Sequence, residues 1–143
     1  MNLRSCSVAI ATSLMLAAGG AWAGDRAWTR DQVSQGLQAP GRAVIVQYEP
    51  AARDAAAATG RITGVYASRD YTGTARVATR LCWGSDQGPC VRVTGRSIQT
   101  HAFDGRAANG PLLLVHQVEG WGTGHPPLFV RGTVTVWFAR PAS

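Results

Sequence analysis

Hydrophobic and polar residues alternate with a period of two along much of the chain, in short stretches that end at glycine, proline, asparagine or aspartate. In residues 75–81, for example, Val77, Thr79 and Leu81 fall on one face, and two arginines and an alanine fall on the other. Such alternation is typical of a β-strand that is buried on one side and faces water on the other. The pattern therefore predicts a protein built from half-buried strands.

Seven or eight strands are predicted in this way, separated by turns at close and fairly regular spacing. Their ranges are 42–48, 61–69, 75–81, 91–94, 97–100, 111–118, 128–130 and 133–138. No long segment has the 3.6-residue period of a helix, and the alanine-rich residues 51–58 are expected to form a surface connection with one or two helical turns. This pattern predicts an all-β fold, an antiparallel β-sandwich of two sheets with an immunoglobulin-like or similar architecture.

The most apolar strand, 111–118, is expected at the centre of a sheet. Burial of large apolar side chains drives the folding of such a domain. The residues expected to supply most of this burial are Leu81, Leu112, Leu114, Val134, Val136 and the tryptophans.

Glycines inside strands indicate local irregularities. Gly64 predicts a β-bulge, with Ile62 and Tyr66 on one face of the strand, and Gly132 predicts a kink before the last strand. Residues 25–35 allow two structures, a short helical turn or an irregular leading strand with Trp28 in the core. The strand is favoured because Gly36 and Pro40 follow closely.

Two cysteines flank a turn between the strands 75–81 and 91–94. Cys82 precedes and Cys90 follows a segment rich in glycine, serine, aspartate and proline. The paired strands of a hairpin bring two such residues within the Cα separation that a disulfide needs. We expect a Cys82–Cys90 disulfide, because two reduced structural cysteines are uncommon in an exported protein.

Export is predicted from the first residues of the chain. A basic start at Arg4 is followed by an apolar run, residues 8–18, and by the small-residue cleavage motif Ala21-Trp22-Ala23. These are the parts of a secretory signal peptide, and the run is shorter than the about 20 residues of a transmembrane helix. We expect residues 1–23 to be removed and residues 24–143 to form a single domain in the periplasm, without an integral membrane segment.

The chain has a formal net charge of +6, and its 14 basic residues are all arginine. A basic surface can attract nucleic acid, anionic lipid or an acidic protein. The arginines are scattered, and no run of them forms the basic arm typical of nucleic-acid binding. We therefore expect no nucleic-acid partner.

The polar residues form no recognisable catalytic or metal-binding pattern. His101, His116 and His125 match no zinc spacing, and no cysteine remains to join them once the two mature cysteines are paired. Ser85 lies in a hairpin tip rather than in a nucleophile elbow. The glycine-rich residues 120–124 are followed by two prolines rather than by the helix that a phosphate loop needs. We expect no enzyme activity, no metal and no cofactor.

Aromatic and imidazole groups in loops are the candidates for contact with a partner. Trp83 in the hairpin, and Trp121 and His125 in the loop 120–127, are assigned this role. His125 could also make a pH-sensitive contact, because histidine titrates near neutrality. His116 lies on an apolar strand and is expected to be a buried histidine with its hydrogen bonds satisfied.

The order and spacing of these features resemble the flagellar protein FlhE family. The resemblance runs from Trp28 to Phe138. Its features are Trp28, the strand 61–68, the hairpin Leu81-Cys82…Cys90-Val91, Phe103, the strand 112–118 and the terminal strand 133–137.

The resemblance implies a periplasmic accessory protein of the flagellum that regulates the flagellar type III export apparatus, limits proton leak during assembly and supports swarming. It implies contact with flagellar rod or export-apparatus proteins, without enzyme activity or a cofactor. The alternative is a general periplasmic binding module. An immunoglobulin-like chaperone would need a long exposed edge strand, and a carbohydrate-binding sandwich would need aromatic rings in one plane.

Overall fold

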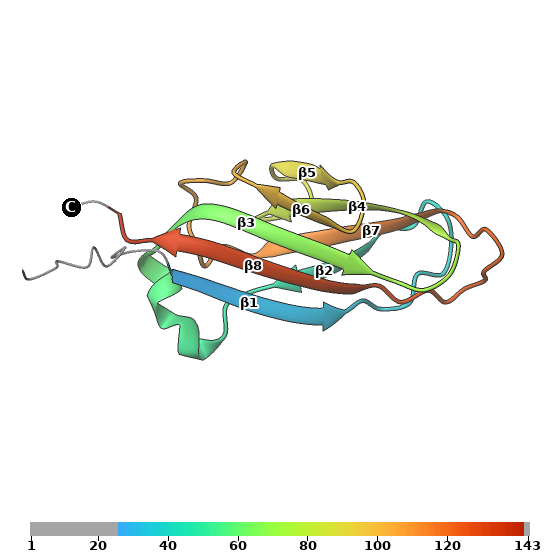
Figure 1. The fold of residues 1–143 in the computed structure, drawn as a ribbon, viewed down its shortest axis with the longest axis horizontal. Helices are drawn as coiled ribbons and strands as arrows, with labels where there is room; N and C mark the ends of the chain where they lie inside the picture. Colours follow the sequence, from blue (N-terminus) through green and yellow to red (C-terminus); the bar gives the residue numbers. More distant parts are fainter. Residues whose placement is uncertain (1–25, 142–143) are drawn as a thin grey trace, which may run out of the picture.

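The computed structural model describes residues 26–141, which form two four-stranded sheets packed face to face (Figure 1). The signal peptide predicted for residues 1–23 lies outside the described residues. The elements in chain order are β1 (Arg26–Val33), β2 (Val44–Tyr48), the 3₁₀ helix η1 (Ala52–Thr59), β3 (Arg61–Asp70), β4 (Arg76–Trp83), β5 (Cys90–Val93), β6 (Ser97–Thr100), β7 (Leu112–Gly120) and β8 (Arg131–Ala139).

The strand order is β1-β8-β3-β6 in one sheet and β2-β7-β4-β5 in the other, and every pairing is antiparallel. The predicted all-β sandwich is confirmed, and the apolar β7 lies inside its sheet as expected. β1 begins opposite the end of β8, with Arg26 paired to Phe138. The edge strands β1 and β2 are joined by a hydrogen bond of 2.7 Å, which Gln32 Nε2 donates to the Gln47 carbonyl oxygen.

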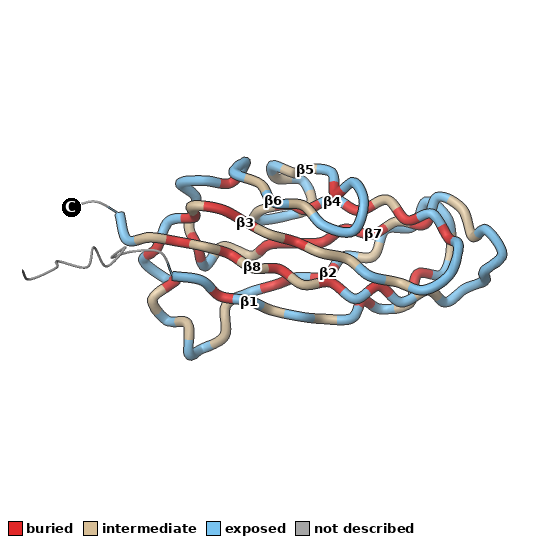
Figure 2. Tube along the Cα trace, viewed as in Figure 1, coloured by how far each residue is buried: buried red, intermediate tan, exposed pale blue. Residues whose placement is uncertain are grey.

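The core lies between the inward faces of the two sheets (Figure 2). Buried positions alternate with more exposed ones along β4 and β8, whereas the first five residues of β7 are all buried. The five aliphatic residues predicted to dominate it, Leu81, Leu112, Leu114, Val134 and Val136, are each 0% exposed. Complete burial of one such side chain stabilises the fold by about 1.5–3 kcal/mol. These residues come from β4, β7 and β8, so they join both sheets in one core.

Trp28 is buried in the core, whereas Trp83, Trp121 and Trp137 are half-buried. The indole Nε1 of Trp28 donates a hydrogen bond of 2.9 Å to the carbonyl oxygen of Ala108. This bond satisfies the polar atom of the ring, as a buried tryptophan requires. Trp28 lies on the regular strand β1, so the helical alternative for residues 25–35 is wrong.

Gly64 interrupts the register between β3 and β8, and the predicted bulge is confirmed. One extra residue in a strand moves the following side chains to the other face. Val65 and Ala67 are therefore buried beside Ile62, and Tyr66 faces outward at the half-buried surface. The prediction that Tyr66 shares a face with Ile62 is wrong for this reason.

Gly132 does not kink the chain, contrary to the prediction, and lies inside the continuous strand β8. The Tyr48 side chain approaches it from the opposite sheet. A Cβ atom at Gly132 would collide with Tyr48 Oη and would lie 2.7 Å from Leu114 Cδ1. Residues 128–130 form no strand of their own, because Leu128 makes only an isolated bridge with Leu37.

The alanine-rich segment is more than a surface connection. It forms η1, which ends at Thr59 with Gly60 as its C-cap, and it buries Ala57 completely. The small side chain of Ala57 lets the helix pack against the core cluster.

We expect Gly132→Ala to lower the free energy of unfolding by about 1–3 kcal/mol, because the new methyl group overfills a packed core. Gly64→Ala is the matched control, since its Cβ would meet its nearest neighbour, His101 Cε1, at 3.5 Å, an ordinary contact. Urea denaturation of both variants measures the difference. Equal stability of the two variants would contradict the close approach of Tyr48.

Candidate functional site

The β4–β5 hairpin holds the two cysteines opposite each other. Cys82 pairs with Cys90 in the register of the two strands. Their Cα atoms lie 4.1 Å apart, and their sulfur atoms are at bonding distance, 2.07 Å. Cys82 is buried on the outer face of its sheet, against Leu113 and Val115. The bond therefore joins the end of β4 to the edge strand β5.

Trp83 follows at the same end of the sandwich and is held by the loop between β6 and β7. Its Nε1 donates a hydrogen bond of 3.2 Å to the Ala107 carbonyl oxygen. The Arg106 guanidinium lies 5.0 Å from the centre of the indole ring. A Cβ atom at Gly110 would lie 2.6 Å from the ring, so glycine is needed there. Trp83 is thus half-buried and engaged within the protein.

Trp121 and His125 lie at the opposite end. The register of β4 and β7 places Trp83 opposite Leu112 and Arg76 opposite Gly120, so the length of β4 separates the two tryptophans. Trp121 packs against a small apolar cluster that includes Val118 and Val130. His125 is exposed on the same loop. The structure therefore places Trp121 and His125 on one loop and leaves Trp83 at the other end.

A network of polar side chains, formed by Arg69, Thr79 and His116, crosses from one sheet to the other. Arg69 extends from β3 to the other sheet, where Nη1 donates to the Val77 carbonyl oxygen and, at 2.9 Å, to Thr79 Oγ1. Its Nε donates to the Gly95 carbonyl oxygen at 2.8 Å. Thr79 Oγ1 in turn lies 2.9 Å from Nδ1 of the fully buried His116. Arg69 thus links β3, β4 and the turn between β5 and β6.

His116 is held in its neutral form. Burial lowers the pKa of His116 from 6.5 to about 4, and the nearby Arg69 charge adds to this effect. Among the described residues, His116 Nε2 has no hydrogen-bond partner, so the expected satisfied histidine has only one of its two nitrogens paired.

The inward position of Arg69 was not predicted from the sequence. Counted without a bulge, Arg69 falls on the outer face of β3. The signal that locates it is Gly64, because the extra residue there places Arg69 on the same face as Val65 and Ala67. A guanidinium at this position can satisfy several backbone and side-chain acceptors at once, since it has five donors.

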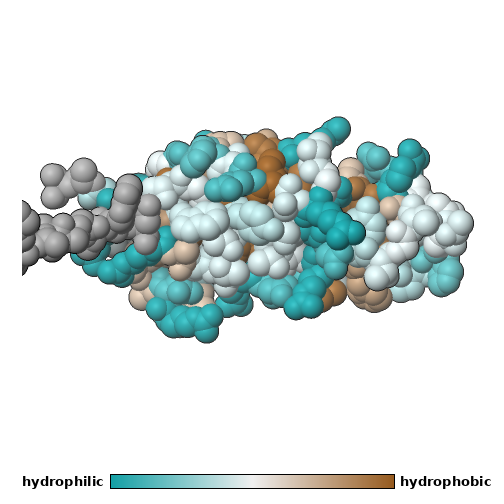
Figure 3. Space-filling view, viewed as in Figure 1, coloured by the Kyte–Doolittle hydropathy of each residue, from teal (hydrophilic) through white to brown (hydrophobic). Residues whose placement is uncertain are grey.

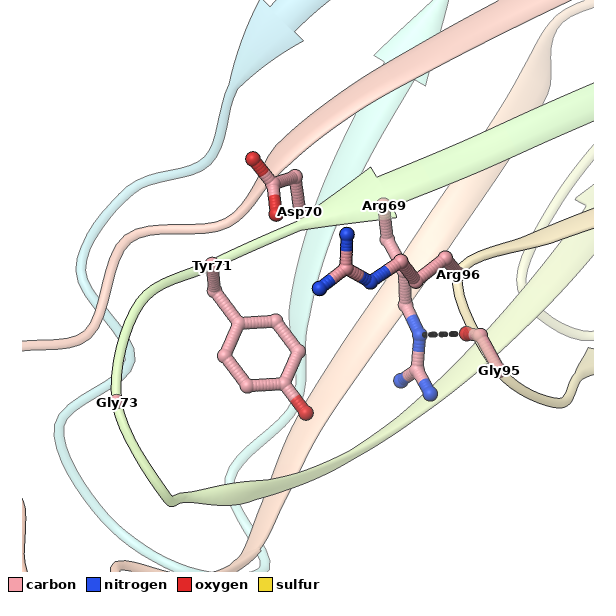
Figure 4. A pocket seen from close by; sticks show the side chains of 6 residues that line it. All are labelled: Arg69, Asp70, Tyr71, Gly73, Gly95 and Arg96. Carbon is pink, nitrogen blue, oxygen red and sulfur yellow. Dashed lines mark hydrogen bonds between the residues drawn. The ribbon is translucent and has the colours of Figure 1, made fainter.

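Arg69 also lines a pocket of about 280 Å³ between the turn that follows β3 and the turn between β5 and β6 (Figure 4). Its guanidinium lies 5.9 Å from the centre of the Tyr71 ring. Figure 4 shows the guanidinium groups of Arg69 and Arg96 on one side of this ring and the Asp70 carboxylate turned away. The pocket is lined by Arg69, Asp70, Tyr71, Gly73, Gly95 and Arg96.

The outer face of the β1-β8-β3-β6 sheet has a different character. The central positions of this face carry side chains with hydroxyl groups. Two of them are Thr29 and Thr135, whose Oγ1 atoms lie 2.8 Å apart. Figure 3 shows this face as mostly pale, of intermediate hydropathy, with hydrophilic residues toward its ends.

Across residues 26–141, no cluster of three or more histidine, cysteine, aspartate or glutamate side chains could hold a metal ion. No helix within the same range has the length and apolarity to cross a bilayer.

These features define an antiparallel β-sandwich protein with a cross-linked hairpin and an arginine-lined pocket on its surface. A family model described as flagellar protein FlhE matches residues 34–138. The chain therefore belongs to the FlhE family of flagellar proteins, as the resemblance implied.

A solved structure supports the same relation. The crystal structure of FlhE superimposes with a TM-score of 0.66 at 27% sequence identity, and the match covers 83% of this chain and 100% of that one. Among curated proteins, no relative matches the chain by sequence.

We expect the double variant Cys82→Ser/Cys90→Ser to lose about 2.5 kcal/mol of unfolding free energy, because the cross-link restricts the unfolded chain. Urea denaturation under oxidising conditions measures this loss. A thiol titration of the unfolded wild-type protein, recovered from the periplasm without reductant, should find residues 82 and 90 unreactive. Two reactive thiols at these positions would refute the disulfide.

We expect the protein to lose stability as the pH falls from 6.5 toward 4. The unfolded chain protonates His116 near pH 6.5, whereas the folded protein resists protonation until about pH 4, so the unfolded state binds more protons in this window. The loss amounts to at most about 3 kcal/mol.

Thermal unfolding at a series of pH values measures this loss. His116→Gln serves as the comparison, because glutamine does not titrate and its amide can still bond to Thr79. Its stability should change less than that of the wild type between pH 6.5 and 4. An identical pH dependence for both proteins would exclude His116 as the cause.

Proposed function

We propose that this protein is exported to the periplasm, where it acts as a flagellar accessory protein that regulates the type III export apparatus through protein–protein contact. In this role it limits proton leak during assembly and supports swarming. The proposal depends above all on one observation, the match of the FlhE family model to residues 34–138. The predicted signal peptide, residues 1–23, supplies the route to the periplasm.

The proposed mode of action is docking rather than chemistry. Its partners are flagellar rod or export-apparatus proteins. The cross-linked hairpin supports this mode, because a rigid surface loses little conformational entropy when it binds. The basic charge of the chain favours acidic faces on such partners. Residues 24–143 would act as one domain in this complex.

The edges of the sandwich give little support to the alternative of a chaperone that donates a strand. β2, β5 and β6 are edge strands of five, four and four residues. The eight-residue edge strand β1 is tied to β2 through Gln32 and Gln47. A donated strand needs a long row of free backbone groups, which these edges offer poorly.

The tryptophans give little support to the other alternative, a carbohydrate-binding module that stacks sugars on Trp83 and Trp121. These two residues lie at opposite ends of the sandwich. Trp83 is also engaged by Ala107 and Arg106. One sugar chain therefore cannot stack on both rings in a common plane.

Deletion of the gene should reduce swarming and acidify the cytoplasm while flagella are being assembled. A ratiometric pH indicator in the cytoplasm and the expansion of a swarming colony measure the two effects. The full chain should restore both, whereas a chain that begins at residue 24 and remains in the cytoplasm should restore neither.

A strain that also lacks the export apparatus is the control, because it has no channel through which protons can leak. Its cytoplasmic pH should not change on deletion. Normal swarming and normal pH in the single deletion strain would refute the proposed function.

A further inference from the structure

Two arginines lie directly opposite each other on the outer face of the β2-β7-β4-β5 sheet. Arg80 of β4 pairs with Arg92 of β5, and both side chains are exposed. Like charges at directly opposite positions of an antiparallel pair destabilise the sheet. The ion pairs within residues 26–141 join Asp31 to Arg131 and His101 to Asp104, so neither Arg80 nor Arg92 is paired with a described carboxylate.

The hydrogen bonds of the described residues also leave these two guanidinium groups largely free. Arg80 Nη1 lies 3.8 Å from Cys90 Sγ, a weak contact. The side chain of Arg92 makes no hydrogen bond to another residue of the described range. The sheet therefore keeps two repelling, poorly paired charges at neighbouring positions.

Between the two arginines and β7 the surface is hollowed. This hollow, which we call the Arg80–Arg92 concavity, has a volume of about 190 Å³. Its floor includes Ala78, which is small, and Val115, which is 3% exposed. Gln117 and Glu119 of β7 line the side away from β5. The concavity thus offers two cationic groups, an amide, one carboxylate and a shallow apolar floor.

Packing alone accounts for only part of this arrangement. The methylene groups of the arginines can cover the outward apolar cluster of Cys82, Leu113 and Val115. That role needs only the aliphatic part of each side chain. It does not account for two cationic side chains at directly paired positions. Glu119 lines the same concavity but forms no ion pair with either of them. A negative group from another molecule would relieve the repulsion between the two arginines.

The Cys82–Cys90 bond fixes the strand register that places the two arginines opposite each other. The cysteines are paired two residues away from Arg80 and Arg92 along the same two strands. A cross-link at this position opposes any slip of the short strand β5 against β4, and a slip of one residue would turn Arg92 to the other face. The register that places Arg80 opposite Arg92 is therefore fixed before a partner arrives.

We propose that the Arg80–Arg92 concavity binds acidic side chains of a protein partner, with aspartate or glutamate carboxylates bridging the two guanidinium groups. A planar guanidinium matches a carboxylate with two parallel hydrogen bonds. Residues 24–143 carry 13 arginines and 8 acidic residues, a net charge of +5 that attracts an acidic face at longer range. This inference rests on the proposed function, which it deepens by naming the contact surface and the chemistry of the partner.

The test compares Arg80→Gln/Arg92→Gln with Arg53→Gln/Arg140→Gln, in which two exposed arginines outside the concavity are removed. Both variants lose the same charge. The probe is a fluorescein-labelled peptide of alternating glutamate and alanine, and its binding is measured by fluorescence anisotropy at low salt. We expect Arg80→Gln/Arg92→Gln, the concavity variant, to bind the peptide about tenfold more weakly than the wild type, because charge-assisted hydrogen bonds are lost. The affinity of Arg53→Gln/Arg140→Gln, the control, should change by less than about twofold.

Further measurements separate binding from folding and carboxylates from other anions. The concavity variant should unfold at the same temperature as the wild type or slightly higher, because a repulsion is removed. Arg80→Lys/Arg92→Lys keeps the charge without the planar fork and should bind with intermediate affinity. No peptide binding by the wild type, or an equal loss in both glutamine variants, would overturn the proposal. A stronger dependence on Arg80 and Arg92 for vesicles of anionic phospholipid than for the peptide would also overturn it.

Complementation of the deletion strain distinguishes this inference from the proposed function. If the deletion impairs swarming and the concavity variant restores it fully, the Arg80–Arg92 concavity is not the contact surface and the proposed function stands. If the deletion has no effect on swarming or pH, the proposed function fails, and peptide binding still decides whether the concavity recognises carboxylates.

Discussion

The extra residue at Gly64 determines which side of β3 faces the other sheet. Before the bulge, Ile62 faces the core. After it, Val65, Ala67 and Arg69 do so. β3 lies inside its sheet, between β8 and β6. Which of its side chains point inward therefore affects the packing of both neighbouring strands and of the opposite sheet. Without the bulge, Tyr66 would have to enter the core, and Arg69 would point into solvent instead of toward Thr79.

The inward turn of Arg69 has consequences at the surface. The same side chain that bonds to Thr79 also lines the pocket with Tyr71 and Arg96. Its bond to Gly95 fixes the turn between β5 and β6, where the chain passes from one sheet to the other. A half-buried cation thus stabilises this connection, beside the backbone hydrogen bond that Arg69 N donates to the Arg96 carbonyl oxygen.

Much of the fold could be predicted from the sequence, because its determinants are local. Alternation along residues 75–81 and 133–138 identifies strands and their inward faces, and the turn residues between Cys82 and Cys90 identify a hairpin. Features that depend on the facing sheet could not be predicted. Gly132 looks like a kink until Tyr48 is known to approach it, and Trp83 and Trp121 look equivalent until the register of β4 and β7 places them at opposite ends.

The pairing of Arg26 with Phe138 has a mechanical consequence. The start of β1 and the end of β8 lie at the same end of the sandwich, in an antiparallel pair at the edge of the sheet. Tension applied between Arg26 and Ala139 would load the interstrand hydrogen bonds one after another, as in opening a zipper, rather than all together in shear. The domain would therefore resist stretching from these two points weakly, and β1 would peel away first.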